Sequence, residues 1–294
     1  MGQDESPGSA ADSPPVQWVS TDWLAEHLQD ENLTILDVQP DVHDYFARHI
    51  PGAVHLNEGL FRMSRGGMPT RYVPAENMQT VIRELGMTAD APVVVYSGKG
   101  DISRAGGGLE QPMAAYTLWR FGMNKVYILD GGLQKWTAEE RPVSQEFPSV
   151  QPSNFTANVR QEQVVTTEQV QRMKEQADVV LLDARPARVY AGKGPWIRPG
   201  HIPGAVNLYW KDLVTKDNPW KLKPAEEITA ALVQRDATPG KTIIVSCGTG
   251  REATQEYLIL SRLLNYPNVK FYEGSFTEWT MDPDRSTVTG QEPR

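Results

Sequence analysis

The sequence predicts an α/β protein with two similar domains, each built on a mainly parallel sheet flanked by helices. Its 294 residues are long for one domain of ordinary size. Four short blocks of sequence occur twice, and in both copies short apolar strands alternate with segments of helical periodicity. This alternation is typical of parallel sheets that are covered by helices. The 39% hydrophobic residues and eight tryptophans can furnish two cores.

The internal repeat consists of four pairs of matching blocks. The pairs are residues 33–38 with 179–184, 48–56 with 199–208, 93–98 with 243–248, and 126–136 with 269–279. The first pair is an apolar strand followed by Asp, the second contains the run His-Ile-Pro-Gly-Ala-Val, and the fourth ends in Trp. The matching Asp, Ser or Cys, and Trp residues lie 143 to 150 positions apart. Such near-constant offsets predict a duplicated domain.

The repeat sets the predicted order of elements along the chain. The first domain spans residues 16–143, with helices expected at 21–28, capped by Ser20 or Thr21, and at 111–121. A linker with several Pro and Ser residues follows at 144–163. The second domain spans residues 164–283 and opens with a helix whose expected N-cap is Thr166. Residues 1–15, rich in Gly, Ser, Asp and Pro, are predicted to be a disordered tail, and residues 284–294 form a second tail.

The most informative stretch surrounds Cys247, the only cysteine of the chain. Ile243, Ile244 and Val245 predict a strand that is buried on both faces. The recurrence of Ala253, Tyr257, Leu260 and Leu264 is the spacing of one helical face. Cys247 is therefore expected at the carboxyl end of a strand and beside the amino end of a helix.

This position suits an anion, because free backbone N–H groups and the helix dipole both favour negative charge there. With Arg251 four residues further on, we expect the pKa of the Cys247 thiol to be depressed and the residue to be a nucleophile. The alternative is a buried cysteine that serves only as a small hydrophobic residue. Gly248 and Gly250 favour the first interpretation, because they let the loop curl its N–H groups inward.

The corresponding loop of the first copy is longer and has Ser97 in place of the cysteine. A serine without a histidine in its loop is a poor nucleophile. The first copy is therefore predicted to be inactive and to wall the cleft opposite Cys247.

Composition excludes several classes of function. The net charge of −8 and the pI near 5.2 argue against nucleic acid or an anionic membrane as the main partner. No apolar run approaches the ~20 residues that a membrane span needs, and a single cysteine cannot form a disulfide framework or a cysteine metal cluster. Residues 1–15 lack the features of a signal peptide. A cytoplasmic protein is the simplest prediction, and an exported protein whose leader has been removed is the alternative.

Together these blocks resemble the tandem-domain rhodaneses, the thiosulfate and 3-mercaptopyruvate sulfurtransferases. The resemblance covers residues 16–283 and rests on the repeated blocks and on the six-residue cysteine loop of the second copy alone. It implies two rhodanese-like domains, a persulfide on Cys247, a small anionic sulfur donor, and a thiol or cyanide as acceptor. The N–H groups of the loop Gly248, Thr249, Gly250, Arg251 and Glu252 would stabilise the persulfide without a metal or cofactor.

The resemblance also implies cations that hold the donor. Arg188 matches a donor-binding arginine of the family, Arg198 resembles a second one, and Arg71 stands near the position of a first-domain histidine in the mercaptopyruvate branch. Thr249 matches a hydroxyl of that branch, but the histidine is missing. Thiosulfate is therefore the first expected donor and 3-mercaptopyruvate the second. Arg185 is expected to form a structural ion pair.

The remaining predictions concern the roles of two histidines and two alternative functions of the protein. His49 and His201 occupy matching turns of both copies, so we expect structural roles for them. A cysteine phosphatase is disfavoured, because its arginine would have to stand six residues after the cysteine, where this chain has Ala253. A non-enzymatic sulfur or selenium carrier, or a redox-sensing module, stays open because the Arg251-Glu252 ending is unusual.

Overall fold

The computed structural model describes residues 14–294, so nearly all of the predicted tail at residues 1–15 lies outside the described residues. The first domain contains a five-stranded parallel sheet with the strand order β1-β7-β6-β2-β3. The strands are β1 (Val16–Val19), β7 (Val126–Leu129), β6 (Val93–Tyr96), β2 (Thr34–Asp37) and β3 (Val54–His55). The short apolar runs of the first copy thus form one sheet.

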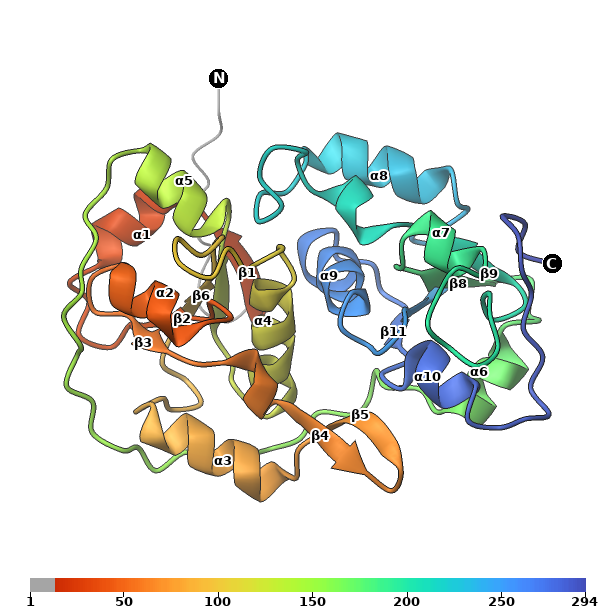
Figure 1. The fold of residues 1–294 in the computed structure, drawn as a ribbon, viewed down its shortest axis with the longest axis horizontal. Helices are drawn as coiled ribbons and strands as arrows, with labels where there is room; N and C mark the ends of the chain where they lie inside the picture. Colours follow the sequence, from red (N-terminus) through yellow and green to blue (C-terminus); the bar gives the residue numbers. More distant parts are fainter. Residues whose placement is uncertain (1–13) are drawn as a thin grey trace.

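Five helices and a hairpin surround this sheet. The helices are α1 (Thr21–His27), α2 (Val42–Ala47), α3 (Ala75–Glu84), α4 (Glu110–Arg120) and α5 (Gly132–Ala138). Ser20 caps α1 by accepting a hydrogen bond from the backbone of Trp23, as predicted. After a short 3-10 turn, η1 (Glu58–Leu60), the antiparallel hairpin β4 (Arg62–Arg65) and β5 (Met68–Tyr72) projects from the first domain toward the second (Figure 1).

The second domain repeats the plan with a four-stranded parallel sheet in the order β11-β10-β8-β9. Its strands are β11 (Val269–Phe271), β10 (Thr242–Ser246), β8 (Val179–Asp183) and β9 (Ala205–Asn207). The helices are α6 (Thr167–Met173), α7 (Ala187–Tyr190), α8 (Ala225–Val233), α9 (Ala253–Leu258) and α10 (Ser275–Trp279), with a 3-10 turn η2 (Trp210–Leu213). Thr166 forms a capping box at α6. The predicted α/β class with two parallel sheets is confirmed.

The helix that follows Cys247 differs from the prediction in one respect. The apolar face at Ala253, Tyr257 and Leu260 is buried, but α9 ends at Leu258 and continues as a π-helical turn, Ile259–Leu263. A π turn has more residues per turn than an α-helix. The sequence spacing alone therefore predicted the buried face but not the change of helix type.

The two domains pack against each other through α4 and α9, which lie side by side between the two sheets (Figure 1). The ring of Tyr116 on α4 lies 5.4 Å from the ring of Tyr257 on α9 and 4.8 Å from that of Phe271 on β11. One cluster of buried apolar residues extends through both domains at this point. A large apolar interface of this kind holds two domains in a defined relative position.

The repeated His-Ile-Pro-Gly turns have structural roles, as predicted. The ring of His201 stacks on Tyr190 at 3.6 Å, and both of its ring nitrogens contact backbone carbonyls, at 3.0 and 3.1 Å. His49 stacks on Tyr45 at 4.0 Å and contacts two carbonyls in the same way. Burial lowers the pKa of His201. Neither imidazole is therefore free to take part in chemistry.

The segments outside the two sheets are attached to the domains. Within the predicted linker, Phe155 is buried and Arg160 donates to the carbonyls of Trp119 and Met123 of the first domain. Within the predicted tail 284–294, Val288 pairs with His201 in a β-bridge. Among residues 14–294, no helix combines the length and the apolar character that a bilayer crossing requires.

Candidate active site

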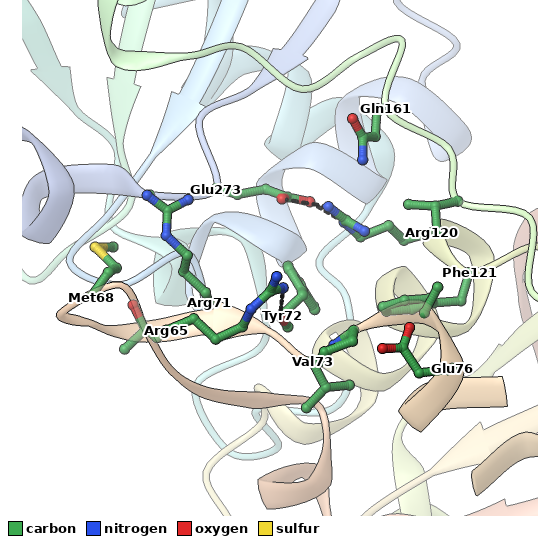
Figure 2. Close-up of a pocket in the computed structure, with 15 residues that line it drawn as sticks. Arg65, Met68, Arg71, Tyr72, Val73, Glu76, Arg120, Phe121, Gln161 and Glu273 are labelled. Carbon is green, nitrogen blue, oxygen red and sulfur yellow. Dashed lines mark hydrogen bonds and ion pairs between the residues drawn. The ribbon is translucent and has the colours of Figure 1, made fainter. Parts of the chain in front are cut away.

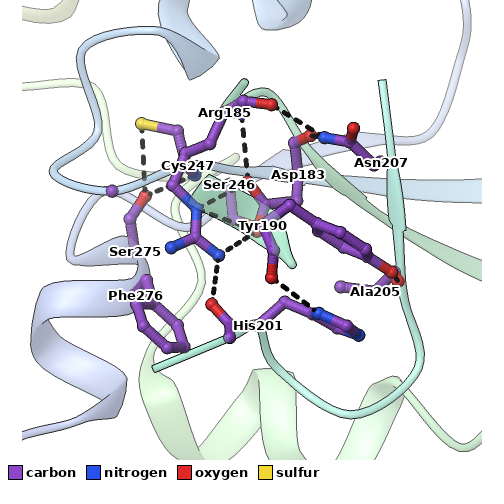
Figure 3. Close-up of polar contacts among 12 residues, drawn as sticks. Asp183, Arg185, Tyr190, His201, Ala205, Asn207, Ser246, Cys247, Ser275 and Phe276 are labelled. Atoms are coloured by element: carbon purple, nitrogen blue, oxygen red, sulfur yellow. Dashed lines mark hydrogen bonds and ion pairs between the residues drawn. The ribbon is translucent and has the colours of Figure 1, made fainter. Parts of the chain in front are cut away.

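Cys247 directly follows β10, which lies between β11 and β8 in the second sheet. Its side chain is fully buried. The backbone N–H of Gly250 donates to Cys247 Sγ at 3.0 Å, so the loop does curl an N–H group toward the sulfur. Ser275 Oγ accepts from the backbone N–H of Cys247 at 3.0 Å and lies 3.9 Å from Sγ (Figure 3). The sulfur is thus contacted from its own loop and from the start of α10.

Ser275 was missed by the sequence analysis, although the repeat contains a signal for it. It stands where the first copy has Gly132, and both residues adopt positive φ, 51° for Ser275 and 57° for Gly132. A left-handed conformation is strained for a residue with a Cβ. The second copy tolerates this strain at the residue whose hydroxyl holds the backbone of Cys247, and such retained strain often marks a functional site.

A matched pair of variants separates the hydroxyl of Ser275 from the backbone strain. Ser275→Gly removes the hydroxyl and relieves the strain, whereas Ser275→Ala removes the hydroxyl and keeps the strain. We expect Ser275→Ala to be less stable than Ser275→Gly by about 1 kcal/mol in chemical denaturation. Both variants should form the persulfide more slowly than the wild type. Equal stabilities of the two variants would contradict the strain at this position.

The predicted depression of the thiol pKa is wrong. Burial raises the pKa of the Cys247 thiol, and the negative charge of Glu252 acts in the same direction. The backbone N–H groups of Ala253 and Thr249 act in the opposite direction but do not compensate. The prediction failed because it considered the helix start and the charge of Arg251 and did not include the burial of the thiol.

Arg251 instead points toward the first domain. Its guanidinium pairs with Glu58 at 2.8 Å and with Glu110 at 3.2 Å. Burial of Arg251 opposes its charge, but these two carboxylates hold the pKa of the guanidinium above its ordinary value. The expectation of a free cation beside the sulfur is therefore wrong, because both carboxylates come from a part of the chain more than a hundred residues away.

The first domain also contacts the loop through Arg62 at the start of β4. Arg62 donates to the carbonyl oxygen of Thr249 at 2.5 Å. The carbonyl is thereby held outward, whereas the N–H of the next residue, Gly250, points inward to the sulfur. We call Arg62, Glu58 and Glu110 the first-domain clamp, because these three residues bind the cysteine loop from outside.

Glu110 is the most buried member of this clamp, with a side chain that is 3% exposed. Its carboxylate accepts the backbone N–H groups of Gly107 and Gly108 at 3.0 Å and faces the indole nitrogen of Trp220 at 3.3 Å. The glycine-rich loop of the first copy thus positions a carboxylate. Ser97, at the start of this loop, is buried and directs its hydroxyl to the carbonyl of Val38, in agreement with the prediction that it is not a nucleophile.

The three arginines predicted to bind the donor have different surroundings. Arg188 on α7 is exposed and has no ion-pair partner within residues 14–294. Arg198 donates to four backbone carbonyls at 2.6 to 2.8 Å, those of Thr280, Asp282, Pro283 and Arg285. The expectation that Arg198 binds a donor is wrong, because its guanidinium is used to attach the C-terminal segment.

Arg71 lines a cavity of about 420 Å³ between the β4-β5 hairpin, the end of α4 and the turn before α10 (Figure 2). Arg65 and Arg120 also line this cavity, whereas Cys247 does not. Arg71 pairs with Glu278 at 2.7 Å. The lining of this cavity therefore includes Arg71 but not Cys247, and a contact of Arg71 with the donor stays a prediction.

Arg185 forms the predicted structural ion pair. It contacts Asp183 at 2.5 Å, donates to the carbonyl of Gly200 at 2.9 Å, and lies 4.2 Å from the centre of the Phe276 ring (Figure 3). Its guanidinium also lies 5.1 Å from the centre of the Trp196 ring. Its Nη1 is buried without a hydrogen-bond partner in the described part of the chain. The ring of Trp196 packs directly on Gly248, where a Cβ atom would lie 2.7 Å from it. A glycine is therefore required at the first position of the loop.

The fold and the site together define a two-domain α/β protein with one loop-bound cysteine in its second domain. A family model for the rhodanese-like domain matches residues 20–139 and 166–282. The chain belongs to the rhodanese-like family.

The chain matches curated relatives over most of their length. The chain is 33% identical to 3-mercaptopyruvate sulfurtransferase of Escherichia coli, covering 89% of this chain and 94% of the relative. It is 32% identical to thiosulfate sulfurtransferase of Azotobacter vinelandii (89% and 93% covered) and to sulfur carrier protein TtuD of Thermus thermophilus (90% and 94% covered). The crystal structure of the 3-mercaptopyruvate sulfotransferase SseA from Escherichia coli superimposes with a TM-score of 0.76 at 32% identity, covering 88% and 98% of the two chains.

Proposed function

We propose that the protein is a sulfurtransferase that moves a sulfane sulfur from a small anionic donor, through a persulfide on Cys247, to a thiol or cyanide. The observation that carries this proposal is the N–H of Gly250, which points at Cys247 Sγ from 3.0 Å at the carboxyl end of the central strand. Such an N–H group binds the negative outer sulfur of a persulfide as well as a thiolate. The family membership and the names of the relatives support the same reaction class.

The reaction transfers one sulfur atom in two displacements. The Cys247 thiol loses its proton to water, its sulfur attacks the outer sulfur of thiosulfate, the sulfur–sulfur bond of the donor breaks, and sulfite leaves with the electron pair. The outer sulfur stays on Cys247 as a persulfide. A thiolate or cyanide then attacks this outer sulfur and restores the cysteine. Loop N–H groups stabilise the anionic sulfur at both stages, so this chain's own residues supply the electrostatic contribution.

The donor is thiosulfate in the first instance and 3-mercaptopyruvate in the second. The hydroxyl of Thr249 supports 3-mercaptopyruvate as donor, whereas the position of that branch's histidine falls near Arg71, which lines a cavity that does not include Cys247. The test is thiocyanate formation with each donor and cyanide, together with mass spectrometry of the protein after donor treatment. A gain of one sulfur atom on the peptide that contains Cys247 is expected. Turnover with neither donor would contradict the proposal.

Arg188 is the cation best suited to the donor, because its charge is exposed and has no ion-pair partner among residues 14–294. We expect Arg188→Ala to raise the KM for thiosulfate about tenfold with little change in kcat, the effect of one lost charge-assisted hydrogen bond. Arg172→Ala is the matched control, since Arg172 is an exposed arginine on the neighbouring helix α6. Equal KM values in both variants would remove Arg188 from the donor site.

A sulfur carrier is the second candidate, favoured by the likeness to TtuD and by the complete burial of the thiol. A carrier would take up one sulfur per chain from another protein and would show little turnover with free donors. Uptake from a persulfidated protein, but not from thiosulfate or 3-mercaptopyruvate, would favour it. Phosphatase activity stays disfavoured, because Arg251 forms ion pairs with Glu58 and Glu110 and is not free to bind a phosphate.

The cellular setting is a proposal from composition. The acidic charge disfavours nucleic acid as a partner. We place the protein in the cytoplasm, with an exported protein as the alternative, and cell fractionation with detection of the native protein distinguishes the two.

A further inference from the structure

The cavity between the β4-β5 hairpin, the end of α4 and the turn before α10 has no part in the proposed reaction, and we call it the hairpin cavity. Its volume is about 420 Å³, within the range of about 300–1,000 Å³ that is typical of small-molecule sites. Cys247 does not line it. Glu273 and Gly274 do, and they directly precede Ser275, which holds the backbone of Cys247. The hairpin cavity is thus separate from the sulfur but shares a supporting turn with it.

A buried ion pair forms one wall of the hairpin cavity. Arg120 on α4 pairs with Glu273 at 2.5 Å, and the two side chains are 10% and 16% exposed. The guanidinium of Arg120 also lies 4.7 Å from the centre of the Tyr72 ring, and Tyr116 donates a hydrogen bond to Glu273 at 2.7 Å. These contacts join the two domains, so the wall is held in place and its two charges compensate each other.

Three other groups at the cavity are available to a ligand. Within residues 14–294, Arg65 on β4 and Glu76 in the first turn of α3 form no ion pair, and Arg65 donates one hydrogen bond, to the carbonyl of Tyr72 at 3.3 Å. The hydroxyl oxygen of Thr70 on β5 is buried and has no hydrogen-bond partner in the same part of the chain. Buried polar atoms are nearly always hydrogen-bonded. This hydroxyl is therefore a group that a ligand in the cavity can satisfy.

The charges that are not compensated lie on two sides of the hairpin cavity (Figure 2). Arg65 and Arg71 come from the hairpin, and the ion pair of Arg71 with Glu278 is made through Nη2 of its guanidinium. Glu76 comes from α3, and Gln161 from the segment that links the domains. The hairpin side thus offers guanidinium donors to a carboxylate, and the opposite side offers a carboxylate and an amide to an ammonium group.

This arrangement disfavours a ligand whose charges all have one sign. A dianion such as phosphate would face the carboxylates of Glu76 and Glu273, and a polycation would face three guanidinium groups. A ligand with a negative group at one end and a positive group at the other matches both sides. The lining also contains apolar side chains, among them Val73 and Phe121, which suit an uncharged middle part.

We propose that the hairpin cavity binds a short peptide through its free ends, with the carboxylate at Arg65 and Arg71 and the ammonium group at Glu76. The hydroxyl of Thr70 donates to the same carboxylate. A peptide suits the cavity better than a free amino acid, because an amino acid carries both charges on one carbon atom, whereas the groups that bind them belong to different elements. This binding site goes beyond the proposed function, since no sulfur takes part in it.

Isothermal titration calorimetry of the full-length protein with trialanine tests the proposal. We expect saturable binding with a Kd of about 1 mM or lower, the affinity that a few charge-assisted hydrogen bonds give. N-acetyl-trialanine lacks the ammonium group and trialanine amide lacks the carboxylate, so each should bind about tenfold more weakly. Absence of saturable binding of trialanine, or equal Kd values for the three peptides, would overturn the proposal.

Variants of the lining assign the binding to the hairpin cavity. Arg65→Met should weaken the binding of trialanine about tenfold but should not weaken that of trialanine amide further, because the carboxylate is already absent. Glu76→Gln should show the same pattern with N-acetyl-trialanine. Both side chains are exposed, so the variants should fold, and Arg172→Met, at an exposed arginine of α6, is the matched control.

The outcomes of these titrations are independent of catalysis. Equal Kd values for trialanine in the wild type, Arg65→Met and Glu76→Gln would place the peptide elsewhere and overturn the proposal. Because no sulfur reacts in the titration, a negative result contradicts the peptide site alone. Absence of turnover with sulfur donors contradicts the sulfurtransferase function alone.

Discussion

Cys247→Ser is expected to abolish sulfur transfer, with a fall in turnover of about three orders of magnitude or more, the scale on which removal of a catalytic nucleophile acts. A hydroxyl in place of the thiol has no comparable nucleophilicity toward sulfur and cannot hold a sulfane sulfur as a persulfide. The site should otherwise be intact, since Ser is close in size and the N–H of Gly250 can donate to an oxygen as well. Thiocyanate formation and mass spectrometry measure the loss.

Cys247 is the only cysteine of the chain, which makes this variant unusually clear. Any sulfur that a donor leaves on the wild type as a persulfide must be on Cys247. The matched control is Ser97→Ala in the first copy, where the buried hydroxyl contacts the carbonyl of Val38. This control should retain turnover. Residual persulfide or substantial turnover in Cys247→Ser would contradict the proposed mechanism.

Arg251→Met is expected to weaken both the fold and the reaction. The change leaves Glu58 and the buried Glu110 without their shared cation. Loss of one partner of a fully buried ion pair costs roughly 3–5 kcal/mol. The side chain of Arg251 is 27% exposed, and Glu110 keeps its bonds to two backbone N–H groups. We therefore expect a decrease of about 2 kcal/mol in the free energy of unfolding, measured by urea denaturation.

The same variant should slow persulfide formation about tenfold, because the cysteine loop loses one of its attachments to the first domain. Glu58→Gln should have a smaller effect, and the double variant should lose less than the two single losses together, since the residues form one network. Arg172→Met, at an exposed arginine, serves as the control for loss of charge. If the effects of Arg251→Met and Glu58→Gln on stability and on persulfide formation were strictly additive, the two residues would not act as one network in the first-domain clamp.

The clamp gives the first domain a role that differs from the predicted one. The sequence indicated a wall opposite Cys247, because Ser97 replaces the nucleophile and the loop is longer. The structure instead shows that Arg62, Glu58 and Glu110 contact the cysteine loop itself. The longer glycine-rich loop of the first copy positions Glu110 for this purpose. The first domain thus supports the cysteine loop of the second domain.

Much of the fold could be predicted from the sequence, because its signals are local. The β-branched run 243–245 and the apolar strands that end in Asp37 and Asp183 define the buried parallel strands, whatever surrounds them. The repeat defined two domains, and the presence of the histidines in both copies indicated their structural role. The position of Cys247 between a strand and a helix followed from the residues on either side of it.

What only the tertiary structure decided are the partners of charged groups and the solvent exposure of the thiol. The sequence does not distinguish Arg251, Arg71 and Arg198, yet each binds groups that are distant in the chain. Arg251 pairs with Glu58, Arg71 pairs with Glu278, and Arg198 donates to the carbonyls of residues 280–285. The raised pKa of the Cys247 thiol likewise depends on the burial of its side chain. Local patterns determine strands and helices, because those hydrogen bonds and periodicities are short-range. Charge pairing and pKa depend on burial and on long-range packing, which no local pattern encodes.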